Sequence, residues 1–429
     1  MAAAALAMLI AVPDVLQILL TACVVAVTLV QVVISVAGLA RPLRATSTHT
    51  TVLDSDLPSY TVIIPAYMEH EVIGGMVRCL ETLDYPRDRL EALLLVERRD
   101  HATKQAIRDA NPASFIRIVE IPPGEPQTKP RSCNAGLLLA KGDLIVVFDA
   151  EDRPHCRQLR IAAEHFIHAD EDLACVQAKL VVSNANQSFI TRQFALEYCL
   201  RYELTLPGLA RLGLPVPLGG TSNHFKTRLL REVGGWDAWN VTEDADLGMR
   251  CSASGYRVEV IDSPTLGQMP HSPAAWTRQR TRWLKGFMLT ALVHTRSPRR
   301  TWQRFGWAGT LTLLAFMAGT PLLYLAQSLA LVLLAANYDG LFVELNFTAL
   351  KGLAVVLASV QLATLLIWVG VAVLAARRRQ MLTALFAPLL PAYWVMLWIA
   401  SWRAVHQLIT APYVWEKTPH ATTTGGGHG

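Results

Sequence analysis

DLIVVFDAED, residues 143–152, joins a short apolar run to three acidic side chains within four positions. Three similar apolar runs come before it, at residues 61–65, 91–97 and 115–121. A stretch with helical spacing follows each of the four runs, at residues 71–83, 101–110, 131–140 and 154–168. Short apolar runs that alternate with helices predict an α/β domain built on a mostly parallel sheet. In open sheets of this kind ligands bind at the carboxyl ends of the strands, so the residues after each run are the candidates for a site.

Three acids, Asp149, Glu151 and Asp152, follow the fourth run directly. Their carboxylates would repel one another beside a buried strand end, and a divalent cation would resolve this conflict. Hard oxygen ligands suit Mg²⁺ or Mn²⁺, and Mg²⁺ is commonly held by one or two carboxylates together with substrate phosphates. The alternative is a solvated turn or a helix N-cap before Pro154, where the helix dipole favours acids. Taken alone, these residues fit both interpretations equally.

A second acidic group occurs in NVTEDAD, residues 240–246. Thr242 can cap a helix over 243–254 that ends at Gly255, because a threonine hydroxyl accepts from the free amides of a first helical turn. Taken alone, this pattern is more typical of a capping box with extra acids than of a catalytic site.

A third group, WTRQRTRW at residues 276–283, places arginine beside tryptophan at helical spacing. It fits a solvated amphipathic face near a membrane. It fits equally a clamp for a polyanion with an aromatic stacking platform. The residues alone leave both interpretations open.

Apolar residues make up 52% of the 429-residue chain and charged residues 17%, and the apolar excess falls at residues 1–40 and 306–411. The run at 14–40 is long enough to cross a bilayer core of about 30 Å and has no basic segment before it. This favours a membrane anchor over a cleaved signal peptide. Three more apolar stretches follow the soluble region, at residues 307–336, 352–375 and 381–411. The last of them fits either a span or an interfacial helix.

Basic residues flank the apolar segments unevenly. Arg41 and Arg44 follow the first segment, and three arginines at 377–379 separate the last two. By the positive-inside rule, the domain after the anchor is cytosolic, which predicts a multi-pass protein of the cell inner (plasma) membrane. Residues 300–318 can begin as an interfacial amphipathic helix, with Pro321 marking a break.

The net charge of +5 is modest, and no basic stripe is interleaved with stacking aromatics. This disfavours a nucleic-acid partner. The seven cysteines, an odd number without a CxxC pair, indicate reduced thiols in a cytosolic compartment.

The three motifs occur in one order, at large separations, with membrane segments after them. In this they resemble the family 2 glycosyltransferases, especially the processive membrane branch related to cellulose, chitin, hyaluronan and curdlan synthases. The resemblance covers residues 60–305 and, more loosely, the membrane segments. Residues 149–151 (DAE) look like the DxD metal motif, 242–244 (TED) like the motif that carries the catalytic base, and 279–283 (QRTRW) match QxxRW.

Three other segments agree with this family. Residues 129–134 (KPRSCN) resemble the segment that carries a lysine and an asparagine toward the nucleotide diphosphate, and residues 219–225 (GGTSNHF) resemble the acceptor-side loop. Residues 415–420 (WEKTPH) are similar to the terminal WxKTxHG segment of a bacterial exopolysaccharide synthase-like subgroup. One departure is Arg99, which stands where the family usually has the second of two acids.

The resemblance implies a GT-A type fold, in which a Rossmann-like sheet binds a nucleotide sugar and transmembrane helices flank the sheet. It assigns Mg²⁺ or Mn²⁺ to Asp149, Glu151 and Asp152. It assigns catalysis to Asp244 as the base, together with Glu243 and Arg282. It assigns substrate binding to Pro65, Tyr67, Glu69, Glu97, Asp100, Lys129, Asn134, Asp149, Thr221, Asn223, Gln279, Arg280 and Trp283.

The implied reaction is inverting transfer of a sugar from a nucleotide diphosphate sugar, UDP-linked by resemblance, to a growing β-linked polysaccharide at the cytosolic membrane face. Lys129 and Arg282 would add positive charge at the leaving diphosphate, and Trp283 would form a stacking floor for the acceptor. Two alternatives stay open. One is a non-processive transferase that acts on a lipid acceptor, and the other is a non-catalytic subunit that binds the nucleotide sugar.

These expectations divide the chain into four parts. They are an N-terminal transmembrane anchor at 1–44, a cytosolic glycosyltransferase domain at 45–299, interfacial and transmembrane helices at 300–411, and a C-terminal segment with a disordered tail at 412–429. The expected partners are the donor, the acceptor and membrane lipids.

Overall fold

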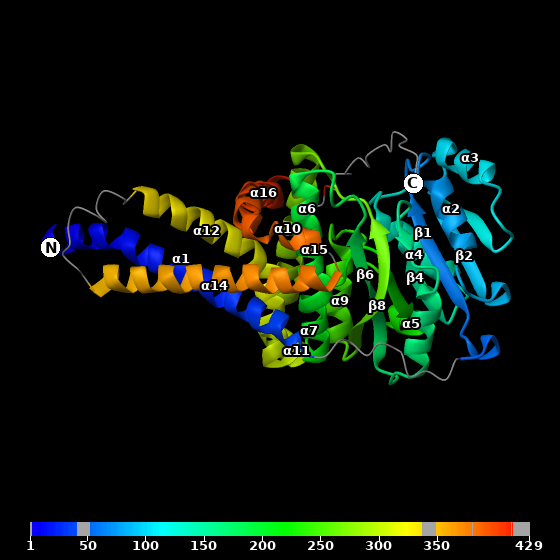
Figure 1. The fold of residues 1–429 in the computed structure, drawn as a ribbon, viewed down its shortest axis with the longest axis horizontal. Helices are drawn as coiled ribbons and strands as arrows, with labels where there is room; N and C mark the ends of the chain where they lie inside the picture. The colour runs from blue at the N-terminus through cyan, green and yellow to red at the C-terminus, as the bar shows by residue number, and fades with distance from the viewer. Residues whose placement is uncertain (1, 41–51, 337–348, 380, 413, 415–429) are drawn as a thin grey trace.

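The molecule has a sheet-containing end and a helical arm (Figure 1). The computed structural model describes residues 2–40, 52–336, 349–379, 381–412 and 414. The arm consists of three long helices, and the described N-terminus lies at its tip. The predicted basic pair Arg41 and Arg44 and the predicted segment 415–420 lie outside the described residues.

A single eight-stranded sheet organises the first end, with strand order β3-β2-β1-β4-β7-β6-β8-β5. Strands β1 to β4 pair in parallel, as do β6 and β8, whereas β7 and β5 run antiparallel to their neighbours. This confirms the predicted α/β domain with a mostly parallel sheet. The strands are β1 Tyr60–Ala66, β2 Leu90–Glu97, β3 Ile116–Ile121, β4 Leu144–Val147, β5 Arg153–Pro154, β6 Leu173–Val182, β7 Asn223–Lys226 and β8 Arg257–Gly267.

Helices pack against both faces of this sheet. Alternate residues of a strand point to opposite faces, so Val62 and Ile64 belong to one hydrophobic cluster and Ile63 to the other. The four helices predicted after the apolar runs are present as α2, α3, α4 and α5. The helices here are α2 Ile73–Glu81, α3 His101–Asp109, α4 Lys129–Leu139, α5 Gln158–Ile167, α6 Phe189–Leu200, α7 Leu206–Arg211, α8 Thr227–Glu232, α9 Glu243–Ala253 and α10 Pro273–Thr295, with π-helical η3 at Arg201–Thr205 and 3₁₀ turns η1 Asp54–Asp56 and η2 Arg87–Arg89.

Helix α9 matches the helix predicted over 243–254, and Gly255 ends it with a φ of 83°. Thr242 occupies the N-cap position, but its side chain makes no cap hydrogen bond. The Thr242 hydroxyl instead donates to Oδ1 of Asn240 at 3.3 Å. The predicted capping role of Thr242 is therefore wrong, because a nearer side chain competes for the hydroxyl.

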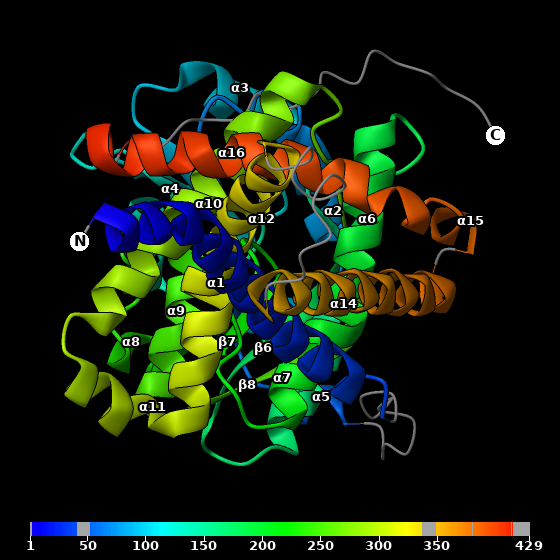
Figure 2. The same ribbon diagram turned by 90° about the vertical axis from the view of Figure 1, so that its left-hand side faces the viewer.

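Three helices in the described residues are long and apolar enough to cross a membrane, at Val15–Ala37, Pro298–Val332 and Val355–Arg378. They correspond to the predicted segments 14–40, 307–336 and 352–375. The final predicted segment forms α16, Leu390–Thr410, which runs across the base of the arm (Figure 2). This placement favours the interfacial alternative for that segment.

The second membrane segment is interrupted twice before it enters the arm. It comprises α11 (Pro298–Leu313), a π-helical turn η4 (Leu314–Ala318) and α12 (Gly319–Ala336). Within α11, Gly306 has a φ of 64° and breaks the helix. Pro321, the predicted break, comes just after the π-helical turn η4, and the helix continues past it because Gly319 between them is helical (φ −65°, ψ −39°). The interruption is therefore a local π-helical distortion and not the end of a helix.

The remaining arm helices are α1 (Ala2–Ala37) and α14 (Ala349–Arg379), followed by α15 (Met381–Ala384) and the 3₁₀ turn η5 (Ala387–Leu389). One hydrophobic cluster runs from the sheet into these helices and includes Phe225, Trp276 and Ala372.

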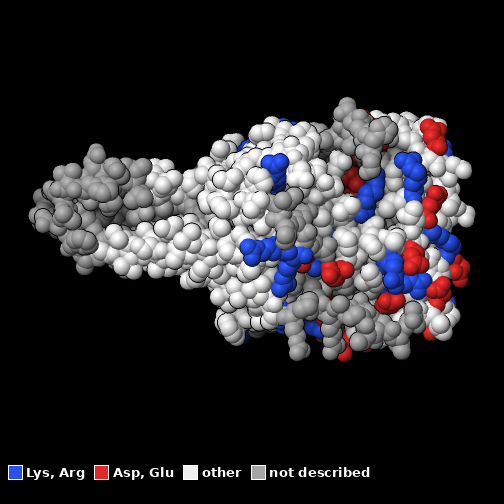
Figure 3. Space-filling view, in the orientation of Figure 1, with Lys and Arg blue, Asp and Glu red and all other residues white. Residues whose placement is uncertain are grey.

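In Figure 3 the arm carries no charged side chain on the visible described surface, and basic side chains gather where the arm meets the sheet-containing end. The predicted division into four parts stays a prediction.

The anchor helix α1 touches α7 with its backbone. A Cβ added at Gly208 would lie 2.0 Å from the carbonyl oxygen of Ile34. We expect Gly208→Val to force the two helices apart and to destabilise the purified protein by about 1–3 kcal/mol, as overpacking does. A fall in Tm in detergent solution would measure this. Gly370→Val on α14 is the matched control, because in the described structure a Cβ there meets no atom within 4 Å. Equal Tm values for the two variants would contradict the expectation.

Candidate functional site

A cavity of about 230 Å³ lies at the carboxyl ends of β1, β2 and β4, and is called the strand-end cavity below. The sequence rule for parallel sheets pointed to this edge. Most of the predicted site residues line the cavity: Pro65, Tyr67, Glu69, Glu97, Lys129, Asp149, Glu151, Asp152, Thr221, Glu243, Asp244, Gln279, Arg282 and Trp283. The structure thus brings together residues from positions 65 to 283 of the chain.

Lys129 and Asp149 form the ionic centre of the strand-end cavity. Lys129 begins α4, and its ammonium group pairs with the Asp149 carboxylate and donates to the carbonyl oxygen of Gly220 at 2.6 Å. Burial alone would lower the pKa of Lys129, but the carboxylates of Asp149 and Glu243 raise it above its ordinary value. A permanently positive group therefore lies beside the predicted metal-binding acids.

Asp152 supports the turn after β4. Its Oδ2 accepts from the backbone amide of Asp149 at 2.9 Å and from the Thr221 hydroxyl. Burial, and then the neighbouring Asp149 and Glu151 carboxylates, raise the pKa of Asp152 well above its ordinary value. Burial and these two neighbours therefore disfavour a negative charge on Asp152.

The assignment of a metal to three acids stays a prediction. Among the described residues, no group of three His, Cys, Asp or Glu side chains is placed to hold a metal ion, and Asp152 is engaged by the turn. Asp149 and Glu151 both line the cavity, and two carboxylates completed by diphosphate oxygens suit Mg²⁺ or Mn²⁺. The remaining pair thus fits a cation that arrives with a phosphate-bearing substrate.

Glu243 and Asp244 lie in the first turn of α9, where the helix dipole favours negative charge. The backbone amide of Ala245 donates to Oδ1 of Asp244 at 2.8 Å. Burial raises the pKa of Asp244, and that amide together with Lys129, Arg201 and Arg282 acts against the rise. Burial and the Asp244 carboxylate raise the pKa of Glu243 to about 7. Glu243 is therefore the acid that more readily holds a proton in this pair.

Helix α10 brings Gln279, Arg282 and Trp283 to the same cavity. It crosses the start of α9 closely, since a Cβ added at Gly286 would lie 2.3 Å from Oγ1 of Thr242. Arg282 donates from Nη1 to the carbonyl oxygen of Val241 at 3.2 Å. The segments 242–244 and 279–283, which are distant in the sequence, thus form one wall.

Two predicted substrate-binding residues lie outside the strand-end cavity and bind other parts of the protein. Arg280 forms a two-pronged ion pair with Glu197, with both N–O distances at 2.7 Å, and contacts the Tyr393 hydroxyl at 3.1 Å. The side-chain oxygen of Asn134 accepts from the backbone amide of Trp236 at 2.9 Å, and its side-chain nitrogen donates to the backbone carbonyl of Trp236 at 2.7 Å. Their predicted substrate contacts stay predictions, and Arg280 lines the second cavity described below.

Two further predicted residues are also placed elsewhere. Asp100 accepts from the backbone amides of Met68 at 2.6 Å and Thr103 at 3.0 Å, and so caps α3 and fixes the loop after β1. Asn223 is buried in β7 and donates to the carbonyl oxygen of Gly219 at 2.6 Å. Both act on the backbone that shapes the cavity and do not line it.

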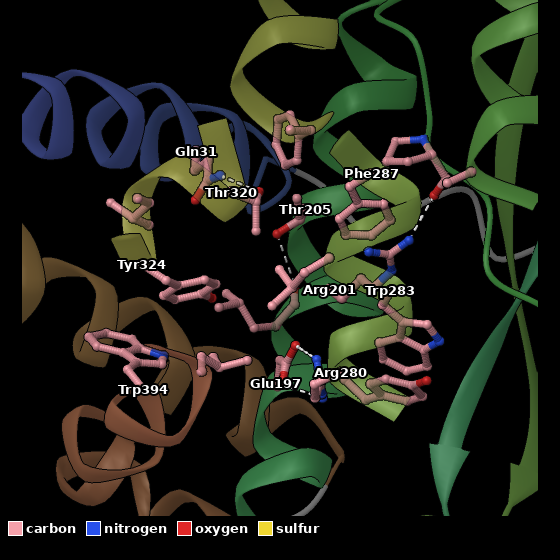
Figure 4. A pocket seen from close by; sticks show the side chains of 18 of the residues that line it. Gln31, Glu197, Arg201, Thr205, Arg280, Trp283, Phe287, Thr320, Tyr324 and Trp394 are labelled. Carbon is pink, nitrogen blue, oxygen red and sulfur yellow. Dashed lines mark hydrogen bonds and ion pairs between the residues drawn. The ribbon is translucent and has the colours of Figure 1, made fainter. Parts of the chain in front are cut away.

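A second cavity, of about 200 Å³, opens between the arm helices and α10 and is called the arm-side cavity below (Figure 4). Its lining is mostly apolar by area, and its charged side chains are Glu197, Arg201, Asp244 and Arg280. The two cavities share five residues, Tyr198, Gly220, Thr242, Asp244 and Trp283. Asp244 therefore faces both cavities.

Sequence reasoning missed this second cavity. Its residues come from α1, α6, η3, α10, α12, α14 and α16, which no local pattern connects. The stretch 189–212 carries five charged residues, Arg192, Glu197, Arg201, Glu203 and Arg211, so no single charge in the sequence singled out Arg201.

Comparisons with known proteins bear on the family and the fold of the chain. The family model described as "Glycosyl transferase family group 2" matches residues 144–369, and that described as "Glycosyl transferase family 2" matches residues 61–224. The chain is 28% identical over 237 residues to the probable glycosyltransferase YdaM of Bacillus subtilis, covering 54% of this chain and 56% of the relative. It is 27% identical over 268 residues to a beta-monoglucosyldiacylglycerol synthase of Synechocystis sp., covering 61% and 54%. The chain thus spans about half the length of the curated relatives it matches.

One solved structure matches almost the whole chain. The mannosyltransferase PcManGT of Pyrobaculum calidifontis, solved in complex with GDP-Man and Mn²⁺, covers 93% of this chain and 99% of its own with a TM-score of 0.60. The identity of 18% makes this a statement about the fold. It confirms the predicted GT-A type architecture.

The pair Glu243 and Asp244 generates a spectroscopic prediction. Because the pKa of Glu243 is raised to about 7, its carboxyl is protonated below that pH and ionises as the pH rises. We expect a protonated-carboxyl infrared band that disappears between about pH 6 and pH 8, one unit on each side of the pKa. Glu243→Gln should remove this band, and the control Glu259→Gln should keep it, since His165 lowers the pKa of Glu259. Persistence of the band in Glu243→Gln would assign it to another acid.

Proposed function

The chain belongs to glycosyl transferase family group 2, and on that premise we propose that it transfers a sugar from a nucleoside diphosphate sugar to the hydroxyl group of a membrane lipid. One observation carries this proposal. Asp244 faces a polar cavity on one side and a mostly apolar cavity between membrane helices on the other. A base in this position serves a water-soluble donor and an acceptor that comes from the bilayer.

The donor would occupy the strand-end cavity. Strand-end residues such as Pro65 and Glu97 would contact the nucleoside, and Lys129 would bind the diphosphate. Asp149 and Glu151 would hold Mg²⁺ or Mn²⁺, which when bound neutralises diphosphate charge and assists its departure. PcManGT, with the same fold, binds GDP-Man and Mn²⁺. A UDP-linked donor stays a prediction of the sequence.

The chemistry follows from the placement of three side chains. Asp244 takes the proton from the acceptor hydroxyl, whose oxygen attacks the anomeric carbon. The bond between that carbon and the diphosphate oxygen breaks, and direct displacement inverts the anomeric configuration. Lys129 and Arg282 stabilise the negative charge that develops on the leaving diphosphate. Trp283, at the junction of the cavities, offers a face on which the sugar packs.

We propose a lipid acceptor in place of the growing polysaccharide that the sequence resemblance implies. The arm-side cavity is lined mainly by apolar side chains, which suit a lipid better than a hydrated glycan. The beta-monoglucosyldiacylglycerol synthase relative is named for a lipid product. The QRTRW motif remains the argument for a polymer, so polymer formation is one outcome of the test.

We also place the catalytic end on the cytosolic side of the inner membrane. Arg377 and Arg378 end α14 at the sheet-containing end and are exposed. Basic residues are retained on the cytosolic side of membrane segments. Nucleotide sugars are made in the cytosol, so this orientation gives the strand-end cavity access to its donor.

The substrate classes are tested with the purified chain in lipid nanodiscs. Labelled UDP- and GDP-sugars are supplied with Mg²⁺, with Mn²⁺ or with a chelator, and lipid and polymer fractions are counted. We expect label in lipid in the presence of metal, with a loss of at least about a hundredfold in the chelator, since the metal neutralises the diphosphate. Label in a high-molecular-weight polymer would support the processive alternative, and label in neither fraction would support a non-catalytic subunit.

The base assignment is tested by Asp244→Asn. This variant keeps the shape of the side chain but cannot take a proton, so transfer should fall by about 10²–10⁴-fold, the range of general-base catalysis. Its Tm and its binding of UDP, measured by calorimetry, should stay near those of the unaltered protein. Near-normal turnover in Asp244→Asn would remove Asp244 from the mechanism.

A further inference from the structure

The arm-side cavity contains two arginines in different surroundings. Arg280 is neutralised by Glu197 and lies over the rings of Phe194 at 4.2 Å and Trp283 at 4.7 Å. Arg201 has no such partner. Among the described residues, no carboxylate oxygen lies within the 4.0 Å ion-pair distance of its guanidinium group.

The Arg201 guanidinium group donates to two backbone carbonyls and forms a hydrogen bond with the side chain of Tyr202. Nη2 donates to the backbone carbonyls of Pro217 at 2.9 Å and Leu218 at 3.3 Å, and the ring of Tyr202 lies 6.0 Å away. Guanidinium has five N–H donors in a planar fork. The group therefore keeps donors for a ligand in the cavity that it lines.

The backbone around Arg201 is irregular in a way that is typical of binding sites. Arg201 begins the π-helical turn η3, and a second π-helical turn, η4, faces the same cavity through Phe316 and Met317. Gln31 of α1 donates to the carbonyl oxygen of Ala315 at 3.2 Å and so supports the second turn. π-Helical turns are rare and occur frequently at functional sites.

Arg201 opposes the rise of the Asp244 pKa from a distance and forms no ion pair with that carboxylate, so its guanidinium group can still pair directly with an anionic ligand. Arginine binds phosphate through two parallel hydrogen bonds, which makes phosphate the best-matched anion. Asp244 lines the same cavity, so the group that attacks the sugar is still a hydroxyl that needs a base.

We infer that the acceptor is an anionic lipid, whose phosphate pairs with Arg201 while a hydroxyl of its headgroup reaches Asp244. This inference rests on the proposed function and narrows it from lipids in general to hydroxyl-bearing phospholipids. A purely structural role of Arg201, in which it only holds the carbonyls of residues 217 and 218, would affect all acceptors alike. The two roles therefore differ in acceptor preference.

The test compares two acceptors with the same acyl chains in neutral phosphatidylcholine nanodiscs. Phosphatidylglycerol has a phosphate and hydroxyls, and diacylglycerol has a hydroxyl without a phosphate. We expect the full chain to use phosphatidylglycerol with a kcat/KM at least about tenfold higher than its kcat/KM for diacylglycerol. Arg201→Gln should lower the phosphatidylglycerol value about 10–100-fold, as loss of a charge-assisted bond predicts. The same variant should change the diacylglycerol value less than about threefold. Arg201→Lys should retain part of the preference.

Arg228→Gln is the matched control, because Arg228 lies on α8, is exposed and pairs with Glu232. It should leave both acceptors unchanged. Equal use of the two lipids by the unaltered chain, or equal losses for both in Arg201→Gln, would overturn the inference and leave the proposed lipid transferase standing. Sugar in polymer and in neither lipid would overturn the proposed function and this inference with it.

Discussion

The ion pair between Arg280 and Glu197 connects the sheet-containing end to the membrane-facing helices. It joins α10 to α6, and the Tyr393 hydroxyl adds α16 to the same contact. Breaking a fully buried pair costs about 3–5 kcal/mol, and less is expected here because 33% of the Glu197 side chain is exposed. With α10 fixed in this way, Gln279, Arg282 and Trp283 keep their place beside the strand-end cavity. The predicted substrate-binding residue Arg280 thus also holds its neighbours in position.

Local sequence patterns were sufficient for strands β1 to β4 and the helices after them, because apolar spacing is determined residue by residue. They could not give the antiparallel insertion of β7 between β4 and β6, since that pairing joins residues about 80 positions apart along the chain, such as Ile145 and Phe225. They also placed a break at Pro321, where the structure has the π-helical turn η4 just before the proline and a helix that continues past it. Local sequence does not show whether a helix with a proline ends there or accommodates it through such a turn.

The site residues also divide into those that local patterns could predict and those that they could not. Strand-end residues such as Glu97 and Asp149 were found because a parallel sheet gathers its carboxyl ends at one edge. Motif position did not reveal which way a side chain faces. The Asn134 amide is used by Trp236, 102 positions further on, and this contact exists only after folding. The arm-side cavity could not be predicted from local patterns for a similar reason, since its walls come from helices at both ends of the chain.

Asp244 lies where the two cavities meet, and charged groups in both cavities affect its strength as a base. Burial raises the pKa of Asp244, while positive groups on both sides, Lys129 and Arg282 by the donor and Arg201 by the acceptor, oppose the rise. A lipid phosphate paired with Arg201 would cancel one of these opposing charges, so the pKa of Asp244 would rise when the acceptor binds. A higher pKa makes Asp244 a stronger base at the moment when the acceptor hydroxyl is present. On this proposal, Asp244 would be the weaker base without the lipid, which would disfavour activation of water against the donor sugar.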